Sequence, residues 1–275
     1  MRAAVLGSPV AHSLSPVLHT AAYAAMGLSE WSYGMHECAE EGLAAFLSGL
    51  GDEWAGLSLT MPLKRRALDL ADTVSDLSRR VGGANTLVRR GGSWHAHNTD
   101  VAGIAEALRE AGVGAPRSAI ILGAGATAAS ALAALVSLGL SSPVTVLARD
   151  TRRTEDLVAA ARRIGHPLKV AALSGLEERL DVDLVVSSLP SGAADHYADL
   201  VAASRADLFD VVYAPWPTRV AAAVAARGGR VIGGFPMLLH QAVEQVRLMT
   251  GVDDVPVEAM REAGEAELAR RSGDG

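Results

Sequence analysis

The first hundred residues alternate short apolar runs with stretches in which apolar side chains recur at the spacing of a helix. The predicted strands are 3–6, 31–36, 55–59 and 84–89, and the predicted helices are 15–26, 40–50 and 63–70. A polar segment with two glycines, 90–95, predicts a hairpin turn. This alternation is typical of a mostly parallel sheet covered by helices.

After a loop at 112–116 the alternation continues with alanine-rich helices. The predicted strands of this half are 119–122, 144–148, 170–173, 184–187, 208–212 and 230–233, and the predicted helices are 101–111, 237–250 and 257–271. We expect residues 272–275 to be disordered. The pattern predicts a two-domain α/β protein in which residues 1–100 and 236–275 form one domain, residues 101–235 form the other, and the last helices return to the first domain.

Composition and charge exclude several classes of protein. The 275 residues are 49% hydrophobic, which is enough apolar material for a sizeable core. A net charge of −6 argues against nucleic-acid binding. The single cysteine, Cys38, excludes a disulfide framework, and His95 and His97 lack an evident third metal ligand. With no apolar run of membrane-spanning length and no signal peptide, we expect a cytoplasmic enzyme that binds no metal, nucleic acid or membrane.

A glycine-rich loop joins the predicted strand 119–122 to an alanine-rich helix. Its residues are Gly123, Ala124, Gly125, Ala126 and Thr127. Free N–H groups of such a turn and the helix dipole together favour a bound pyrophosphate. Ala128 replaces the third glycine of the usual fingerprint, a replacement that this position tolerates. The second domain is therefore predicted to be a Rossmann-type dinucleotide-binding domain.

The residues after the next strand bear on the choice of dinucleotide. NAD sites usually place a carboxylate there, whereas NADP sites use arginine for the 2′-phosphate. Arg149 and Arg153 predict a phosphate clamp and hence NADP(H), whereas Asp150, turned inward, would favour NAD.

Polar residues cluster where strands of the first domain are predicted to end, which is where α/β sheets build their sites. They include Ser13 and Ser15, Thr60 and Lys64, and Asn85, with Asp100 shortly after. Serine hydroxyls suit a carboxylate, and amide, hydroxyl and carboxylate groups suit ring hydroxyls. Only two of the 25 basic residues are lysine, and a lysine, unlike an arginine, can pass a proton. Lys64 with Asp100 is therefore a candidate acid–base pair, although Lys64 also fits a surface position and Ser15 a helix cap.

Seven collinear blocks between residues 5 and 250 resemble the shikimate dehydrogenase family. They are Gly-Ser-Pro-Val-Ala-His-Ser-Leu-Ser-Pro at 7–16, Leu-Thr-Met-Pro-Leu-Lys at 59–64, Ala-Asn-Thr at 84–86, Asn-Thr-Asp at 98–100, Gly-Ala-Gly at 123–125, Asp-Val-Val-Tyr-Ala-Pro at 210–215 and Met-Leu-Leu-His-Gln-Ala at 237–242. The resemblance implies reversible NADPH-dependent reduction of 3-dehydroshikimate to shikimate, a step toward chorismate and the aromatic amino acids. A monomer or a homodimer is expected.

The resemblance also implies roles for individual residues. Lys64 and Asp100 would be the catalytic pair; Ser13 and Ser15 would bind the substrate carboxylate, and Thr60, Asn85, Tyr213 and Gln241 its other polar groups. The loop 123–127 would hold the pyrophosphate and Arg149 with Arg153 the 2′-phosphate. The nicotinamide side would be lined by Ser188, Leu189, Gly234 and Met237.

Several positions depart from the family pattern. Ser58, Ala148, Asp150 and Pro236 stand where Asn, Asn, Thr and Gly are usual, and residues 187–190 read Ser-Ser-Leu-Pro in place of Asn-Ala-Thr-Ser. They bear on cofactor affinity and identity and remove no catalytic group. Two alternatives stay open. One is a quinate/shikimate dehydrogenase that prefers NAD, which Asp150 favours and Ser13 disfavours; the other is a catalytically idle relative that binds shikimate or nucleotide.

Overall fold

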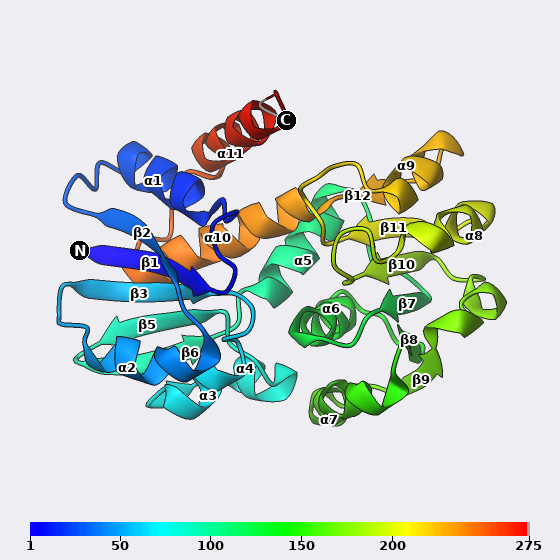
Figure 1. Ribbon diagram of the computed structural model, residues 1–275, viewed down its shortest axis with the longest axis horizontal. Helices are drawn as coiled ribbons and strands as arrows, with labels where there is room; N and C mark the ends of the chain where they lie inside the picture. The colour runs from blue at the N-terminus through cyan, green and yellow to red at the C-terminus, as the bar shows by residue number, and fades with distance from the viewer. Residues whose placement is uncertain (274–275) are drawn as a thin grey trace. The chain divides into compact units, whose positions relative to one another are not determined.

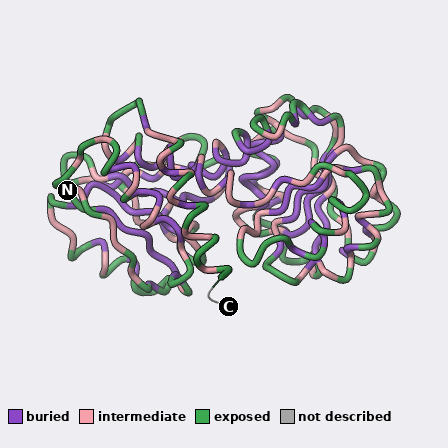
Figure 2. The backbone as a smooth tube through the Cα atoms, turned by 90° about the horizontal axis from the view of Figure 1, so that it is seen from above, coloured by how far each residue is buried: buried purple, intermediate pink, exposed green. Residues whose placement is uncertain are grey.

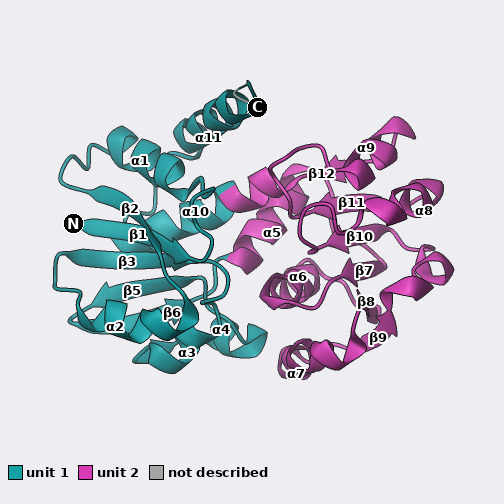
Figure 3. Ribbon diagram, viewed as in Figure 1, with its two compact units in different colours: residues 1–99, 239–275 teal, residues 100–238 magenta. Residues whose placement is uncertain are grey.

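The computed structural model describes residues 1–273 and contains two compact units (Figure 3). The first comprises Met1–Thr99 and the chain from Leu239 onward, and the second Asp100–Leu238. Asp100 and residues 236–238, expected in the first domain, therefore fall in the second unit. Figure 2 shows that buried segments lie in the interior of each unit and exposed segments toward its surface. No helix among residues 1–273 is both long and apolar enough to cross a membrane.

The first unit is built on a mixed six-stranded sheet of order β2-β1-β3-β5-β6-β4 (Figure 1). Its strands are β1 (Arg2–Gly7), β2 (Ser32–Glu37), β3 (Trp54–Leu59), β4 (Thr73–Val74), β5 (Thr86–Arg90) and β6 (Ser93–His97). Strands β1, β2 and β3 run parallel, whereas β5 is antiparallel to β3 and β6. Its helices are α1 (Ser15–Ala25), α2 (Leu43–Ser48), α3 (Arg66–Leu70), α4 (Asp76–Val81) and α11 (Val257–Gly273).

Local chemistry explains where these elements differ from the predicted ones. The predicted helix 63–70 begins only at Arg66, because hydrogen-bonded turns occupy residues 60–65. The predicted turn 90–95 is confined to Gly91 and Gly92, which both have positive φ, and its remaining residues are strand. Two short elements, β4 and α4, were not predicted. Helix α4 has its own end signals, since Ser75 accepts from the Ser78 N–H and Gly82 ends it in the left-handed region.

The C-terminal helices return to the first unit, as predicted. Helix α11 packs on α1. Helix α10 (Gly234–Thr250) places Met249 against Gly56 of β3, where a Cβ atom would lie 2.7 Å from the Met249 Cγ. Ser272 and Gly273 end α11, so their predicted disorder is wrong; Asp274 and Gly275 lie outside the described residues.

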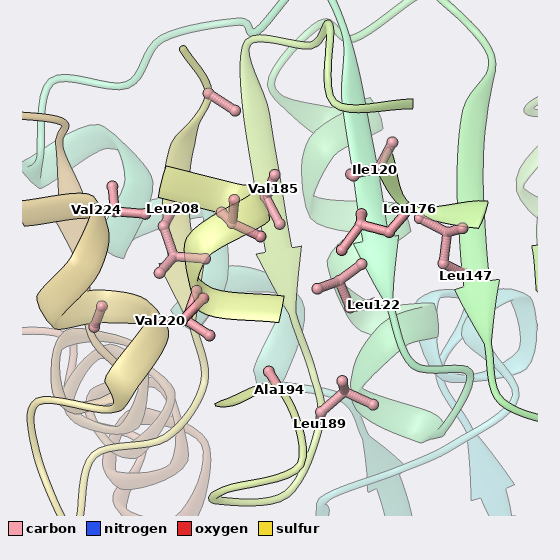
Figure 4. Close-up of a cluster of buried hydrophobic side chains, with 14 of the residues drawn as sticks. Ile120, Leu122, Leu147, Leu176, Val185, Leu189, Ala194, Leu208, Val220 and Val224 are labelled. Carbon is pink, nitrogen blue, oxygen red and sulfur yellow. The ribbon is translucent and has the colours of Figure 1, made fainter. Parts of the chain in front are cut away.

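The second unit has the strand order of a doubly wound nucleotide-binding fold. All its strands run parallel, in the order β9-β8-β7-β10-β11-β12. They are β7 (Ala119–Leu122), β8 (Val144–Ala148), β9 (Leu168–Ala172), β10 (Leu184–Ser187), β11 (Asp207–Asp210) and β12 (Val231–Ile232). Its helices are α5 (Asp100–Glu110), α6 (Ala126–Ser137), α7 (Glu155–Ile164), α8 (Ala198–Ala203) and α9 (Arg219–Ala226). Figure 4 shows the core cluster that includes Ile120, Val185 and Leu208 of adjacent strands. This architecture confirms the predicted Rossmann-type fold.

Candidate functional site

The glycine-rich loop 123–127 of the second unit has a backbone conformation that depends on Gly123. Gly123 follows β7 at φ +103°, where residues with a side chain are strained. A Cβ atom on it would lie 2.5 Å from the Ser188 Oγ. The Ser188 hydroxyl donates to the Leu122 carbonyl at 2.9 Å, which fixes this close approach. The chain therefore turns sharply from β7 into α6, as predicted.

The N-terminus of α6 is suited to hold an anion. Gly125 is the exposed N-cap, and no side chain among the described residues caps the helix. A Cβ atom on Gly125 would meet nothing within 4 Å, so the space beside its backbone is open. The first turn, which contains Ala126 and Thr127, has no acidic residue. Unshared N–H groups and the helix dipole thus favour a phosphate at this position.

The residues directly after β8 include arginines and one carboxylate, Asp150, which is already hydrogen-bonded to one of them. Asp150 accepts hydrogen bonds from the Arg152 Nε at 2.9 Å and Nη2 at 3.0 Å, and this guanidinium lowers the pKa of the Asp150 carboxyl. Arg149 and Arg153 are exposed, and within residues 1–273 neither makes an ion pair. The Asp150 carboxylate is therefore already bonded to Arg152, whereas the exposed guanidinium groups of Arg149 and Arg153 are suited to bind an anion.

The other residues predicted on the cofactor side differ in exposure. Ser188 is half-buried, whereas Leu189 is 9% exposed and belongs to the core cluster of this unit (Figure 4). Gly234 lies so close to the Val211 carbonyl that a Cβ atom would overlap it, and Met237 is buried. Their contact with a nicotinamide stays a prediction.

Tyr213 lies half-buried in a loop that Asp210 ties together. The buried Asp210 carboxylate accepts from the Thr218 hydroxyl at 2.9 Å and from the Val212 N–H at 3.2 Å. Burial raises the pKa of the Asp210 carboxyl. Because these bonds join both ends of the loop 211–218, Asp210 shapes the segment that carries Tyr213.

In the first unit, Gly7 brings the end of β1 against the turn after β3. A Cβ atom on Gly7 would overlap the Thr60 side chain, so only glycine permits this approach. Thr60 donates its N–H to the Leu6 carbonyl at 2.9 Å. Beyond β1, the half-buried Ser13 accepts the Ser15 N–H at 3.2 Å, and Ser15 is buried at the start of α1. The two predicted carboxylate-binding serines therefore lie together.

Asn85 is the centre of a buried polar cluster. Its Oδ1 accepts from the Thr99 N–H at 2.8 Å, and its Nδ2 donates to the Thr99 Oγ1 at 2.9 Å and to the Gln241 Oε1 at 3.3 Å. The side chains of Asn85, Thr99 and Gln241 are all buried. The structure thus brings together two predicted substrate-binding amides, one beside β5 and the other on α10.

Lys64 lies in the turn between β3 and α3 and is half-buried. Its carbonyl accepts the Ala84 N–H at 2.7 Å, which anchors the turn beside the segment that carries Asn85. Asp100 is buried and begins α5 directly after Thr99, but it opens the second unit, whereas Lys64 belongs to the first. Their pairing stays a prediction.

Two polar residues of the first unit, Tyr33 and Gln245, were missed by sequence reasoning, whereas Thr86 and Thr99 lie in the recognised family blocks but were assigned no role of their own. The Tyr33 hydroxyl donates to the Ser58 Oγ at 2.6 Å, and burial raises the pKa of Tyr33. Gln245 bonds to Ser58 and Thr86 and is 1% exposed. The sequence pattern could have indicated Gln245, because this residue stands one turn after Gln241 on a face of α10 that is otherwise apolar.

A buried histidine stacks on Tyr33. The His19 and Tyr33 ring centroids lie 3.9 Å apart, and the His19 Nδ1 bonds to the Ser15 carbonyl at 2.8 Å. Burial lowers the pKa of His19 to about 4, so its ring is neutral at pH 7. Among residues 1–273 no group of three or more His, Cys, Asp or Glu side chains is placed to hold a metal ion.

Two family models match the chain. The one described as the shikimate dehydrogenase substrate binding domain covers residues 5–87, and the one described as the shikimate 5′-dehydrogenase C-terminal domain covers residues 234–263. A curated relative, the NADP(+) shikimate dehydrogenase of Methanosarcina mazei, is 34% identical over 94% of this chain and 95% of its own length.

Solved structures of related enzymes have the same fold. Shikimate dehydrogenase of Mycobacterium tuberculosis superposes with a TM-score of 0.89 at 44% identity, over 96% of this chain and 99% of that one. The Thermus thermophilus enzyme, in complex with NADP(H) and shikimate, gives 0.84 at 34% identity, over 97% and 99%. Quinate dehydrogenase of Corynebacterium glutamicum, in complex with NAD, gives 0.86 at 28% identity, over 97% and 99%.

Proposed function

The chain belongs to the shikimate dehydrogenase family, and we propose that Lys64 and Asp100 are the catalytic pair of its reaction. The protein is an NADP-dependent oxidoreductase of the shikimate pathway that acts on a CH–OH group and interconverts shikimate and 3-dehydroshikimate. The observation that carries the site assignment is the buried Asn85–Gln241 bond, because it joins two of the residues that the family motifs assign to the substrate.

The substrate site is assigned to the first unit. Ser13 and Ser15 supply hydroxyl groups for the shikimate carboxylate, while Thr60, Asn85 and Gln241 bind the hydroxyl and carbonyl oxygens. The family motif also assigns Tyr213 to the substrate. Support comes from the 3.2 Å bond between the two serines and from the polar cluster around Asn85. A site made of hydrogen-bonding groups suits a small polyhydroxylated acid, since it rejects analogues that leave buried polar groups unpaired.

The cofactor site is assigned to the second unit, whose residues fit NADP(H). The uncapped α6 and the open space beside Gly125 suit the pyrophosphate, and Arg149 with Arg153 suits the 2′-phosphate. Ser188, Leu189, Gly234 and Met237 are assigned to the nicotinamide side. When bound, NADP(H) supplies or accepts the hydride.

Proton transfer is assigned to Lys64. Reduction of the carbonyl leaves negative charge on its oxygen, and a lysine ammonium group can donate a proton to that oxygen in the transition state. Asp100 orients the ammonium group and the substrate hydroxyl. In the reverse direction Lys64 takes the proton back, so the same pair serves oxidation of shikimate.

Fewer observations support the two alternatives, an NAD-preferring quinate/shikimate dehydrogenase and a relative that binds its ligands without turnover. The main reason to expect NAD is weaker because the Asp150 carboxylate is hydrogen-bonded by Arg152, although this ion pair is exposed. Presence of Lys64, Asp100, Asn85 and Gln241 together argues against an idle binder. Shikimate and NADP(H) are small water-soluble metabolites, which favours a cytoplasmic location. We expect a monomer or a homodimer, which sedimentation velocity distinguishes.

The role of Lys64 is tested by comparing Lys64→Ala with Lys169→Ala, since Lys169 is the only other lysine and lies exposed on β9. We expect Lys64→Ala to lower kcat roughly 100-fold or more while the KM for shikimate changes little, as for a group that acts in the transition state. Lys169→Ala is expected to match the wild type. A raised KM with unchanged kcat in Lys64→Ala would show that Lys64 binds substrate only.

A further inference from the structure

A continuous chain of hydrogen bonds, buried except at its half-buried Tyr33 end, runs behind Asn85. The Tyr33 hydroxyl donates to the Ser58 Oγ at 2.6 Å, and the Ser58 hydroxyl donates to the Gln245 Oε1 at 2.8 Å. The Gln245 Nε2 donates to the Thr86 Oγ1 at 3.1 Å, and the Thr86 hydroxyl donates to the Asn85 Oδ1 at 3.0 Å. The chain thus links β2, β3, α10 and β5 through side chains alone.

The donors and acceptors along this chain allow one direction only. Gln245 uses its Oε1 as acceptor for Ser58 and its Nε2 as donor to both Thr86 and the Asn85 carbonyl, which lies 3.3 Å away. A reversed Gln245 amide would place its Oε1 against the Asn85 carbonyl oxygen, so that two acceptors would face each other with no proton between them. Its orientation therefore requires Thr86 to donate toward Asn85.

The Thr86 hydroxyl reinforces the orientation of the Asn85 side chain that the Thr99 N–H, which can only donate, also favours. The Asn85 Oδ1 receives both the Thr86 hydroxyl and the Thr99 N–H, so the opposite side of the amide, Nδ2, is turned to the Gln241 Oε1. Since amide oxygen and nitrogen have nearly the same shape, only hydrogen-bond polarity distinguishes the two orientations of Asn85.

We propose that Gln245, with Ser58 and Tyr33, is a positioning group that holds the Asn85 and Gln241 amides in one fixed orientation before substrate binds. This inference rests on the proposed function, in which both amides bind shikimate. A preset arrangement of donors and acceptors strengthens binding because the substrate does not have to order the site. Ser58 is well suited to this task, because its single hydroxyl both accepts from Tyr33 and donates to Gln245.

Substitutions that break the chain are expected to weaken substrate binding selectively. Gln245→Leu removes the amide while keeping a side chain of similar size, and it should raise the KM for shikimate about tenfold. Tyr33→Phe removes the hydroxyl at the start of the chain, which also interacts with the Ser15 side chain, and a rise of about threefold is expected. In both variants the KM for NADP should stay at the wild-type value, because Gln245 and Tyr33 lie in the first unit.

Tyr23→Phe is a matched control for Tyr33→Phe. The Tyr23 hydroxyl is also buried, and it has no hydrogen-bond partner among the described residues. Its removal should leave both KM values unchanged. A general loss of stability in Tyr33→Phe, by contrast, would change the KM for NADP as well.

In the Gln245→Glu variant, the pH dependence of the KM for shikimate is a measurement that a purely structural role of Gln245 would not affect. A protonated glutamate can accept from Ser58 and donate its one proton to Thr86, and so replaces the glutamine bonds of the chain, whereas an ionised glutamate can only accept. Ionisation would draw the Thr86 hydroxyl toward Glu and away from Asn85. We therefore expect the ratio of the variant KM for shikimate to the wild-type KM to lie near one at low pH and to rise severalfold as pH increases.

Shikimate KM values that stay at the wild-type level in Gln245→Leu and Tyr33→Phe, or a Gln245→Glu ratio independent of pH, would overturn the positioning role. Asn85→Ala separates this failure from failure of the proposed function. If Asn85→Ala raises the KM for shikimate while Gln245→Leu does not, the substrate site stands and the positioning role is wrong. If Asn85→Ala also leaves the KM unchanged, the assignment of Asn85 to the substrate is wrong.

Discussion

Asp150 and Arg152 form a two-point ion pair directly after β8, with the Arg152 Nε at 2.9 Å and Nη2 at 3.0 Å from the Asp150 carboxylate. This pair bears on cofactor choice, because a carboxylate at the end of this strand is what an NAD site uses to bind ribose hydroxyls. With Asp150 occupied by Arg152, the exposed Arg149 and Arg153 remain to meet a 2′-phosphate.

Arg149→Ala is expected to weaken the binding of NADP and to leave that of NAD nearly unchanged. An arginine–phosphate contact at an exposed site contributes about 1–2 kcal/mol, which corresponds to a rise of roughly 5- to 30-fold in the KM for NADP. Steady-state kinetics with each cofactor at saturating shikimate measure the effect. Equal losses for both cofactors would show that Arg149 does not contact the 2′-phosphate.

Gly123→Ala is expected to lower the stability of the protein, whereas Gly125→Ala is expected to weaken cofactor binding. Gly123 has φ +103° and lies against Ser188, so alanine there should lower the free energy of unfolding by about 1–3 kcal/mol. Gly125 has φ −80° and open space beside it, so alanine there should leave stability nearly unchanged but obstruct the pyrophosphate. Urea unfolding and NADP titration of both variants check this. If both variants lost the same free energy of unfolding, the assignment of Gly123 to the fold of the loop and of Gly125 to the pyrophosphate would be wrong.

His19 should make the protein less stable in mild acid. Its pKa is lowered to about 4 in the folded protein, against an ordinary value near 6.5, so the unfolded chain binds more protons between these pH values. The stability due to neutral His19 is therefore complete above pH 6.5 and is lost as pH falls toward 4, by roughly 3 kcal/mol. Unfolding free energies of the wild type and His19→Gln across this range measure it.

His12→Gln is the control for the acid dependence, because His12 is exposed. It should retain the wild-type loss of stability between pH 6.5 and 4, whereas His19→Gln should lose much less. Parallel curves for wild type and His19→Gln would mean that His19 is not the responsible group.

Much of the fold follows from local patterns. Strand β7 was predicted because it is a continuous apolar run, and β3 because its run is interrupted by one polar residue, Ser58; both strands are buried along their whole length. The strand β4 was missed because two residues are too few for a period to be visible. The sheet order, and with it the antiparallel direction of β5, depends on contacts between residues far apart in the chain, which spacing does not report.

The candidate site was predicted where a residue's own chemistry is distinctive. Asn85 and Lys64 stand out because their residue types are rare in this chain. Gln245 was missed because its role depends on Ser58, 187 residues away in sequence, which meets it only in the folded unit. The engagement of Asp150 by Arg152 likewise depends on side-chain direction, which the sequence leaves undetermined.

The most direct test of the central claim is an absorbance assay of nicotinamide reduction with purified protein. Shikimate or quinate is offered, each with NADP or NAD, and initial rates are compared. We expect turnover confined to shikimate with NADP. Preference for quinate or for NAD would contradict this specificity and make Asp150 the residue to substitute first, and absence of turnover in all four combinations would contradict enzymatic function itself.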